Sequence, residues 1–217
     1  MAADGEHVRR RRVRPVHARG EETRQSILEA AESIFADIGY GAARLDQVAQ
    51  AVGIRRPSIL YYFASKQDLY DAVEADIFAS MHAFAQERIQ GVTDPLDRLL
   101  ALLDAWLDFN VARPSAARII QRLVADAATP RRNNPTEFSF SALEDIEAVF
   151  ADGVRAGAFR PLSPMLFLNG VAGSVLFYVC NSGQLGDTRR YDPADPAELA
   201  RFRALLHLLA RTAVRPG

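Results

Sequence analysis

The sequence predicts an all-α fold with a small N-terminal three-helix domain and a larger C-terminal helical domain. Apolar residues recur three and four positions apart along most of the chain, which is the spacing of one helix face, and no segment shows the clear period-two alternation of a strand. Proline and glycine signals at helix ends divide this pattern into about nine helices. The 217 residues, of which 49% are hydrophobic and 24% charged, are enough for two such domains.

The first helix is predicted over residues 23–38, after a basic arm. Thr23 stands at its N-terminal end, where a hydroxyl can cap the helix or a phosphate can bind. Gly39 ends the helix because it tolerates a positive φ. Residues 1–20 hold six arginines and almost nothing to bury, so we expect a disordered arm, either a solvated tail or an extension that contacts DNA. The inward residues of the helix are Ile27, Ala30, Ala31, Ile34, Phe35 and Ile38.

Residues 44–66 contain the pattern of a helix-turn-helix. Apolar residues at positions 45, 48, 49 and 52 share one face, and Gly53 follows where the chain must turn. Ile59 and Phe63, four positions apart, give the second helix its own inward face. Its outer face carries arginines, hydroxyls and phenols, a division of faces that suits a helix lying in a DNA groove. We expect a DNA-binding helix-turn-helix at about residues 44–63.

Six further helices are predicted beyond the turn, most of them from signals at their starts. Ser65 is a cap that forms a capping box with Asp68, while Asp94-Pro95 and Asp195-Pro196 are cap-and-proline pairs. The predicted helix at residues 165–180 is apolar nearly all round and needs cover on both sides, either from a second copy or from within one chain. The six helices cover residues 66–90, 95–109, 114–124, 138–154, 165–180 and 196–209.

Three segments of the N-terminal part resemble one protein family at matching spacing. TRQSILEAAESIFADIGY, VAQAVGI and ILYYFASKQDLYDAV are similar to the N-terminal domain of the TetR family of bacterial transcription regulators, over about residues 21–81. The resemblance implies a repressor that binds a palindromic operator in double-stranded DNA. It also implies that residues 82–217 form a regulatory domain that takes a small-molecule effector, and that the chain forms a homodimer through its two C-terminal helices.

The matching positions assign the DNA contacts. Base edges fall to Arg55, Arg56 and Ser58, where an arginine–guanine contact contributes about 1–3 kcal/mol of discrimination. Phosphate contacts fall to Arg44, Tyr61, Tyr62 and Lys66, together with the start of the first helix at Thr23. For Tyr61, packing against the first helix is the alternative, and Lys66 is otherwise a solvated cation.

The chain departs from the family pattern at several of these positions. Arg44 stands where Ser or Thr is usual, and Arg55 stands where a capping Ser is common. Leu60 replaces a common Tyr, and Tyr62 a common His. Because an arginine cannot accept a backbone N–H as a serine cap does, we expect the recognition helix to start at Arg56 or Pro57, where proline favours the first turn.

Large aromatic residues of the C-terminal domain are the candidates for an effector pocket, although simple core packing is the more common role of such residues. They favour an apolar or aromatic effector. The candidates are Trp106, Phe109, Phe138, Phe150, Phe167 and Phe177.

Catalysis, metal binding and cofactor binding find no support in the sequence. The four histidines lack ligand spacing, and no nucleophile elbow or phosphate-binding glycine loop is present. A single cysteine, Cys180, in an apolar run indicates a buried structural thiol and a reducing cytoplasm. No apolar run approaches the roughly 20 residues that span a bilayer. We expect a cytoplasmic protein that is not an enzyme and has no membrane segment.

Charge is distributed unevenly along the chain and agrees with contact to DNA at one end. Residues 1–66 carry 11 Lys and Arg against 8 Asp and Glu, whereas residues 67–217 carry 15 against 19. Two other functions remain open: a protein that organises DNA without regulating a promoter, and a ligand-binding protein or enzyme whose helix-turn-helix is vestigial. The sequence names neither the operator, the effector nor the target genes, and does not separate a repressor from an activator.

Overall fold

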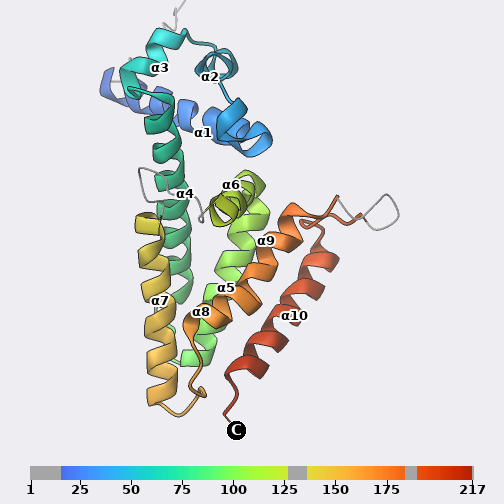
Figure 1. Ribbon diagram of the computed structural model, residues 1–217. Coiled ribbons are helices and arrows are strands. Elements are labelled where there is room, and N and C mark those ends of the chain that lie inside the picture. The colour runs from blue at the N-terminus through green and yellow to red at the C-terminus, as the bar shows by residue number, and fades with distance from the viewer. Residues whose placement is uncertain (1–15, 127–135, 184–189, 217) are drawn as a thin grey trace, which may run out of the picture.

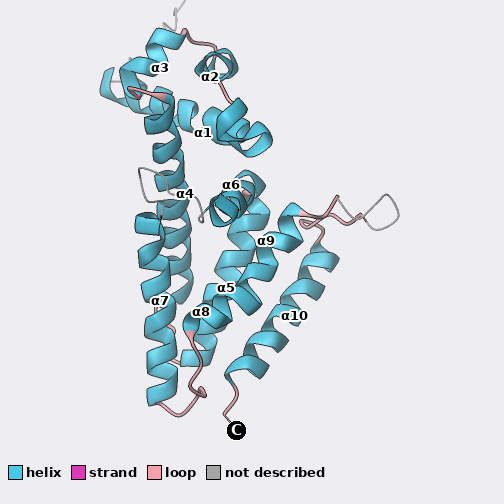
Figure 2. Ribbon diagram, viewed as in Figure 1, coloured by secondary structure: helices cyan, strands magenta, loops and turns pink. Residues whose placement is uncertain are grey.

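The computed structural model describes residues 16–126, 136–183 and 190–216, and this part of the chain consists of helices joined by turns and loops, without a strand (Figures 1 and 2). If α8, the π-helical turn η1 and α9 are counted as one interrupted helix, these residues form nine helices, as predicted. The elements are α1 Val16–Ala42, α2 Leu45–Val52, α3 Arg56–Tyr62, α4 Lys66–Ile89, α5 Pro95–Ala112, α6 Pro114–Asp126, α7 Thr136–Arg155, α8 Pro164–Phe167, η1 Leu168–Ala172, α9 Gly173–Cys180 and α10 Pro196–Val214.

Helix α1 begins earlier than the sequence pattern indicated. It starts at Val16, so residues 16–20 are helical and were wrongly assigned to the disordered arm, while residues 1–15 lie outside the described part. A single Gly20 inside a helix costs only about 1 kcal/mol, which the rest of α1 outweighs. Thr23 therefore lies within the helix and does not cap it. The predicted end is confirmed as a kink at Gly39, whose φ is 77°.

The helix-turn-helix forms as the sequence predicts. Helix α2 ends at Gly53, whose φ is 75°, and its amide N–H bonds back to the carbonyls of Ala49 and Gln50. Helix α3 starts at Arg56 without a side-chain cap from Arg55, which confirms the effect expected of the arginine at this position. The Ser65 hydroxyl accepts the amide N–H of Asp68 at 3.1 Å and caps α4.

Helices α4 and α6 belong to both hydrophobic cores of the molecule. Leu69 and Val73 of α4 pack in the core of the N-terminal domain, whereas Ile89 at its other end packs in the core of the C-terminal domain. Ile119 of α6 packs with the N-terminal core and Ala117 with the C-terminal core. In Figure 1, α4 runs from the helix-turn-helix down along α5 and α7. These two helices therefore join the domains.

The apolar helix predicted at residues 165–180 is interrupted. Leu168–Ala172 form a π-helical turn between α8 and α9, and the carbonyl of Ala172 accepts the indole N–H of Trp106 at 2.9 Å. The wider turn is compatible with the two glycines of this segment, Gly170 and Gly173, and the Trp106 contact satisfies a carbonyl near its end. The segment still packs one face inward and leaves the other exposed.

Candidate DNA-binding surface and effector cavity

The outer face of α3 and the start of α2 present the predicted DNA contacts to solvent. Arg44, Arg55, Arg56 and Ser58 are exposed, and Tyr61 is the most open at 84%. Arg56 lies 3.6 Å from Asp46, but both side chains are more than half exposed, so the pair contributes little and can yield to a phosphate or base. These residues form one surface on the helix-turn-helix.

Two of the remaining predicted contacts take part in the packing of the domain. Tyr62 is half-buried and packs against the N-terminal core, with its ring edge-on to that of Tyr61 at 5.1 Å. Thr23 is also half-buried and lies inside α1, away from the helix start where a phosphate was expected. Their contact with DNA stays a prediction.

Arg44 caps α2 in an unusual way. Its backbone N–H donates to the side-chain oxygen of Gln47 at 2.8 Å, and its own side chain makes no cap hydrogen bond. The reach of Gln47 back to the cap residue supplies half of a capping box. The guanidinium of Arg44 is therefore spared for other contacts.

Lys66 points inward to the end of α1. Its ammonium donates to the carbonyls of Tyr40 at 2.7 Å, Ala43 at 3.0 Å and, less closely, Gly41 at 3.5 Å, and it lies 4.3 Å from the centre of the Tyr40 ring. An ammonium has three protons, and all three face carbonyls here. Lys66 thus ties α4 to the chain between α1 and α2, and a phosphate contact would require one of these bonds to open.

A cluster of charges that sequence reasoning missed joins the two domains. Arg113, between α5 and α6, binds the carboxylate of Glu32 on α1 and also donates to Asp76 on α4 at 2.7 Å. Ser115 donates to Glu32 at 2.5 Å. Glu32 is 4% exposed, so its charge depends on these partners. The one sequence signal was an acidic residue one turn from the inward-facing Phe35.

Two more arginines of α6 reach α1. Arg122 donates to the carbonyls of Ala36 at 3.0 Å and Asp37 at 3.2 Å, where α1 approaches its kink. Arg118 pairs with the Asp37 carboxylate at 2.6 Å, with both side chains open to solvent. Helix α6 is therefore attached to the DNA-binding domain by charge as well as by apolar packing.

A cavity of about 400 Å³ lies in the C-terminal domain, and its described lining is almost entirely apolar. Two of the candidate aromatic residues, Trp106 and Phe167, line it. The structure does not place Phe109, Phe150 or Phe177 in the lining: the first two are buried in the neighbouring cores, and Phe177 is 59% exposed on the outer face of α9. The side chain of Phe138 lies outside the described residues. The other apolar lining residues include Phe78, Met81, Leu99, Leu102, Leu103, Ile120, Leu123, Leu143, Ile146, Leu168 and Leu176.

Two polar side chains of the lining, His82 of α4 and Asp145 of α7, lie close together. The Asp145 carboxylate accepts the amide of Gln86 at 2.6 Å and lies 3.2 Å from Nδ1 of His82. Both His82 and Asp145 belong to the lining. Nδ1 of His82 is buried, and its contact with Asp145 is not aligned as a hydrogen bond. These two residues are 63 positions apart, and no sequence pattern pairs them.

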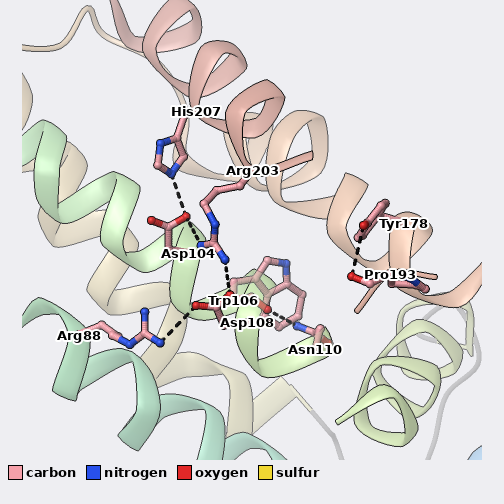
Figure 3. Close-up of polar contacts among 9 residues, drawn as sticks. All are labelled: Arg88, Asp104, Trp106, Asp108, Asn110, Tyr178, Pro193, Arg203 and His207. Atoms are coloured by element: carbon pink, nitrogen blue, oxygen red, sulfur yellow. Dashed lines mark hydrogen bonds and ion pairs between the residues drawn. The ribbon is translucent and has the colours of Figure 1, made fainter. Parts of the chain in front are cut away.

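Ion pairs run across α5 beside the cavity (Figure 3). Asp108 lies between Arg88 of α4, at 3.2 Å, and Arg203 of α10, at 2.5 Å. Asp104 accepts from Arg203 at 2.7 Å and lies 2.8 Å from Nε2 of His207. Trp106, which lines the cavity, sits on the same helix between the two aspartates. The row connects α4 with α10 through the helix that carries Trp106.

The outer faces of α8, α9 and α10 expose large apolar side chains. Leu166 is 66% exposed, Phe177 59% and Leu208 61%, and Met165, Leu205 and Leu209 are also exposed. Exposed apolar patches of this kind are typical of surfaces that bind another molecule. Behind it, Tyr178 stacks on Phe202 with ring centres 4.0 Å apart, and burial raises the pKa of Tyr178 to about 12. The helix pair is thus firmly packed on its inner side.

Other site chemistry is not supported by the described residues. They contain no group of three or more His, Cys, Asp or Glu able to hold a metal ion. Among the helices in this part of the chain, none is both long and apolar enough to cross a membrane. Burial raises the pKa of the Cys180 thiol, which keeps it protonated and poorly nucleophilic, as its apolar setting predicted.

Known proteins resemble the chain in both domains. Residues 27–73 match the family model of bacterial regulatory proteins, tetR family, and residues 95–208 match that of a tetracyclin repressor-like C-terminal domain. The transcriptional regulator RutR of Escherichia coli O157:H7 is 28% identical over 145 residues, which are 65% of this chain and 66% of RutR.

Solved structures share the fold. The fatty acid degradation regulator FadR from Bacillus halodurans superposes with a TM-score of 0.70 at 20% identity, over 87% of this chain and 94% of that protein. FadR from Bacillus subtilis, solved in complex with stearoyl-CoA, gives a TM-score of 0.67 at 15% identity, over 88% of this chain and 99% of that protein. At these identities the likeness concerns architecture alone.

Proposed function

The chain belongs to the TetR family of bacterial transcription regulators, and we propose that it is a cytoplasmic repressor released from a palindromic operator by a small apolar effector. The main support for this proposal is that one molecule combines an exposed cationic face on α3 with an apolar cavity bounded by α4 and α6. These two helices also pack into the DNA-binding domain. A ligand that moves them therefore also moves α3.

On the DNA side, Arg55, Arg56 and Ser58 read base edges, while Arg44 and Tyr61 contact phosphates. The division is the one that the matching positions of the family imply, and the exposure of these side chains on α3 and at the start of α2 supports it. Phosphate contacts set the register, and contacts to base edges in the major groove supply the sequence preference. Arg44 adds a charge at a position where its relatives usually carry a hydroxyl.

On the effector side, the ligand occupies the cavity beside Trp106 and Phe167. Operator and effector exclude one another because each favours a different placement of α4 and α6, so the coupling is reciprocal. A cavity of about 400 Å³ falls in the size range of small-molecule sites.

The regulator acts as a homodimer through the exposed apolar faces of α8, α9 and α10. Regulators of this family bind DNA, dimerise and take small-molecule ligands. A two-fold axis along this patch pairs Leu166, Phe177 and Leu208 with their copies, and it places two α3 helices to read the two halves of a palindrome.

Footprinting tests this function. The full chain is incubated with genomic fragments, bound fragments are recovered, and protection is mapped. A regulator protects one short palindrome of two half-sites, whereas a DNA-organising protein spreads over the fragment. The absence of any protected DNA, with the cavity still able to bind ligands, would instead indicate a ligand-binding protein with a vestigial head.

A further inference from the structure

The effector cavity has apolar walls and one charged group. Leu99, Leu103, Ile120, Leu123, Phe167 and Leu176 are typical of the walls. The described lining holds no lysine and no arginine, and Asp145 is its only acid. Asn169 is also present, but its amide donates to the carbonyl of Met165 at 2.9 Å. The chemistry of the polar end therefore depends on Asp145 and His82.

Asp145 keeps capacity for another hydrogen-bond donor. A carboxylate has about four acceptor positions, of which the Gln86 amide uses one at 2.6 Å. His82 lies at 3.2 Å without hydrogen-bond alignment, and among the described residues its buried Nδ1 has no hydrogen-bond partner. A carboxylate among apolar walls is costly unless it is well paired. Among the described residues, the Gln86 amide is the one aligned donor to this carboxylate, so its pairing within this part of the chain is incomplete.

The net charge of the described lining does not favour an anionic ligand, whether His82 is neutral or protonated. If His82 is neutral, the described lining carries one negative charge from Asp145. If His82 is protonated, the two charges cancel. In neither state does a ligand carboxylate meet an excess of positive charge, and in the first state it meets a like charge in a poorly solvated space.

We infer that this cavity selects an apolar effector with a cationic or hydrogen-bond-donating head group, which the carboxylate of Asp145 binds. The inference rests on the proposed function, since it names the ligand chemistry of the same cavity. An alkyl or aromatic amine fits best, an alcohol less well, and a fatty acid worst. The stearoyl-CoA bound by the structurally similar regulator carries an anionic group, so this chain is expected to differ from it in ligand chemistry.

The single tryptophan of the sequence makes the inference directly measurable. Trp106 lines the cavity, so its fluorescence reports on occupancy there without interference from a second tryptophan. The full-length protein is titrated with decylamine, 1-decanol and decanoate, which share one chain and differ in the head group, below the concentrations at which they form micelles. Decylamine is expected to bind at least about tenfold more tightly than decanoate, with decanol between them.

Two variants locate the preference at one carboxylate. Asp145→Asn is expected to remove most of the preference for decylamine while decanol still binds. Glu144→Gln is the matched control, because it removes the same charge from an exposed position one residue away on α7. It is expected to keep the wild-type ranking.

The outcomes separate the inference from the function on which it rests. The inference would be overturned if decanoate bound the wild type as tightly as decylamine, or if Asp145→Asn kept the preference for decylamine. Either result would still be consistent with an effector site in this cavity. No response of Trp106 to any of the three probes would overturn both. If Asp145→Asn does not fold, the order of the affinities of the three probes for the wild-type protein still tests the inference.

Discussion

Arg113 donates from Nε to both carboxylate oxygens of Glu32, at 2.9 and 3.0 Å, and so holds the start of α6 against the middle of α1. The same guanidinium reaches Asp76 of α4. One side chain from the link between α5 and α6 therefore binds both α1 and α4 at the junction of the DNA-binding and C-terminal domains. Any displacement of α4 or α6 around the cavity has to be transmitted past this contact.

Removing Arg113 is expected to destabilise the protein strongly. Arg113→Met leaves the Glu32 carboxylate, 4% exposed, without its charge partner, and breaking a buried pair in this way costs about 3–5 kcal/mol. Arg118→Met is the matched control, because the side chains of Arg118 and Asp37 are 45% and 59% exposed and such a pair contributes at most about 1 kcal/mol. Urea unfolding compares the two, and equal losses would show that Arg113 is not a structural anchor.

Lys66 is expected to act more on stability than on DNA affinity. Lys66→Met removes charged hydrogen bonds to the carbonyls of Tyr40 and Ala43, each worth about 1.5–3 kcal/mol at most, and leaves those carbonyls to water or to no partner. Arg44→Met, at an exposed position with no side-chain cap bond, should leave the melting temperature nearly unchanged and weaken DNA binding. If Lys66→Met kept the wild-type melting temperature but bound DNA poorly, the result would instead support the phosphate contact predicted for Lys66 from its sequence position.

The outer face of α10 should control the oligomeric state. Leu208→Glu places a charge at a leucine of the apolar patch that is 61% exposed, so it should convert the dimer to a monomer. Leu60→Glu makes the same change at a 42% exposed leucine on α3 and should remain dimeric. Light scattering after size-exclusion chromatography gives the masses. A dimeric Leu208→Glu protein would place the interface elsewhere.

Local signals explain what the sequence predicted well. Asp94 and Asp195 each accept two backbone N–H groups at the helix starts they were expected to cap, and Gly53 takes the positive φ of the turn. Each signal acts within about four residues, where residue type alone determines the hydrogen bond or the backbone angle. The helices and their order follow from such signals.

Contacts between distant residues explain what could not be predicted. Arg113 and Glu32 are 81 positions apart, and His82 and Asp145 meet only because α4 packs on α7. An aromatic residue that lines the cavity differs from one that faces solvent by the direction of a helix face, as Phe167, which lines the cavity, and the exposed Phe177 show. Composition alone does not carry that direction. The cavity and the charged junction are therefore results of tertiary packing.

The central claim is that α3 reads an operator through its two exposed arginines. The most direct test is fluorescence anisotropy with the footprinted operator at fixed salt, comparing wild type, Arg55→Ala/Arg56→Ala and the control Arg155→Ala/Arg215→Ala, which removes two exposed arginines of the C-terminal domain. At about tenfold per lost base contact, the α3 variant should bind about 100-fold more weakly, and the control should match wild type. Unchanged operator affinity in a folded, dimeric α3 variant would contradict the claim.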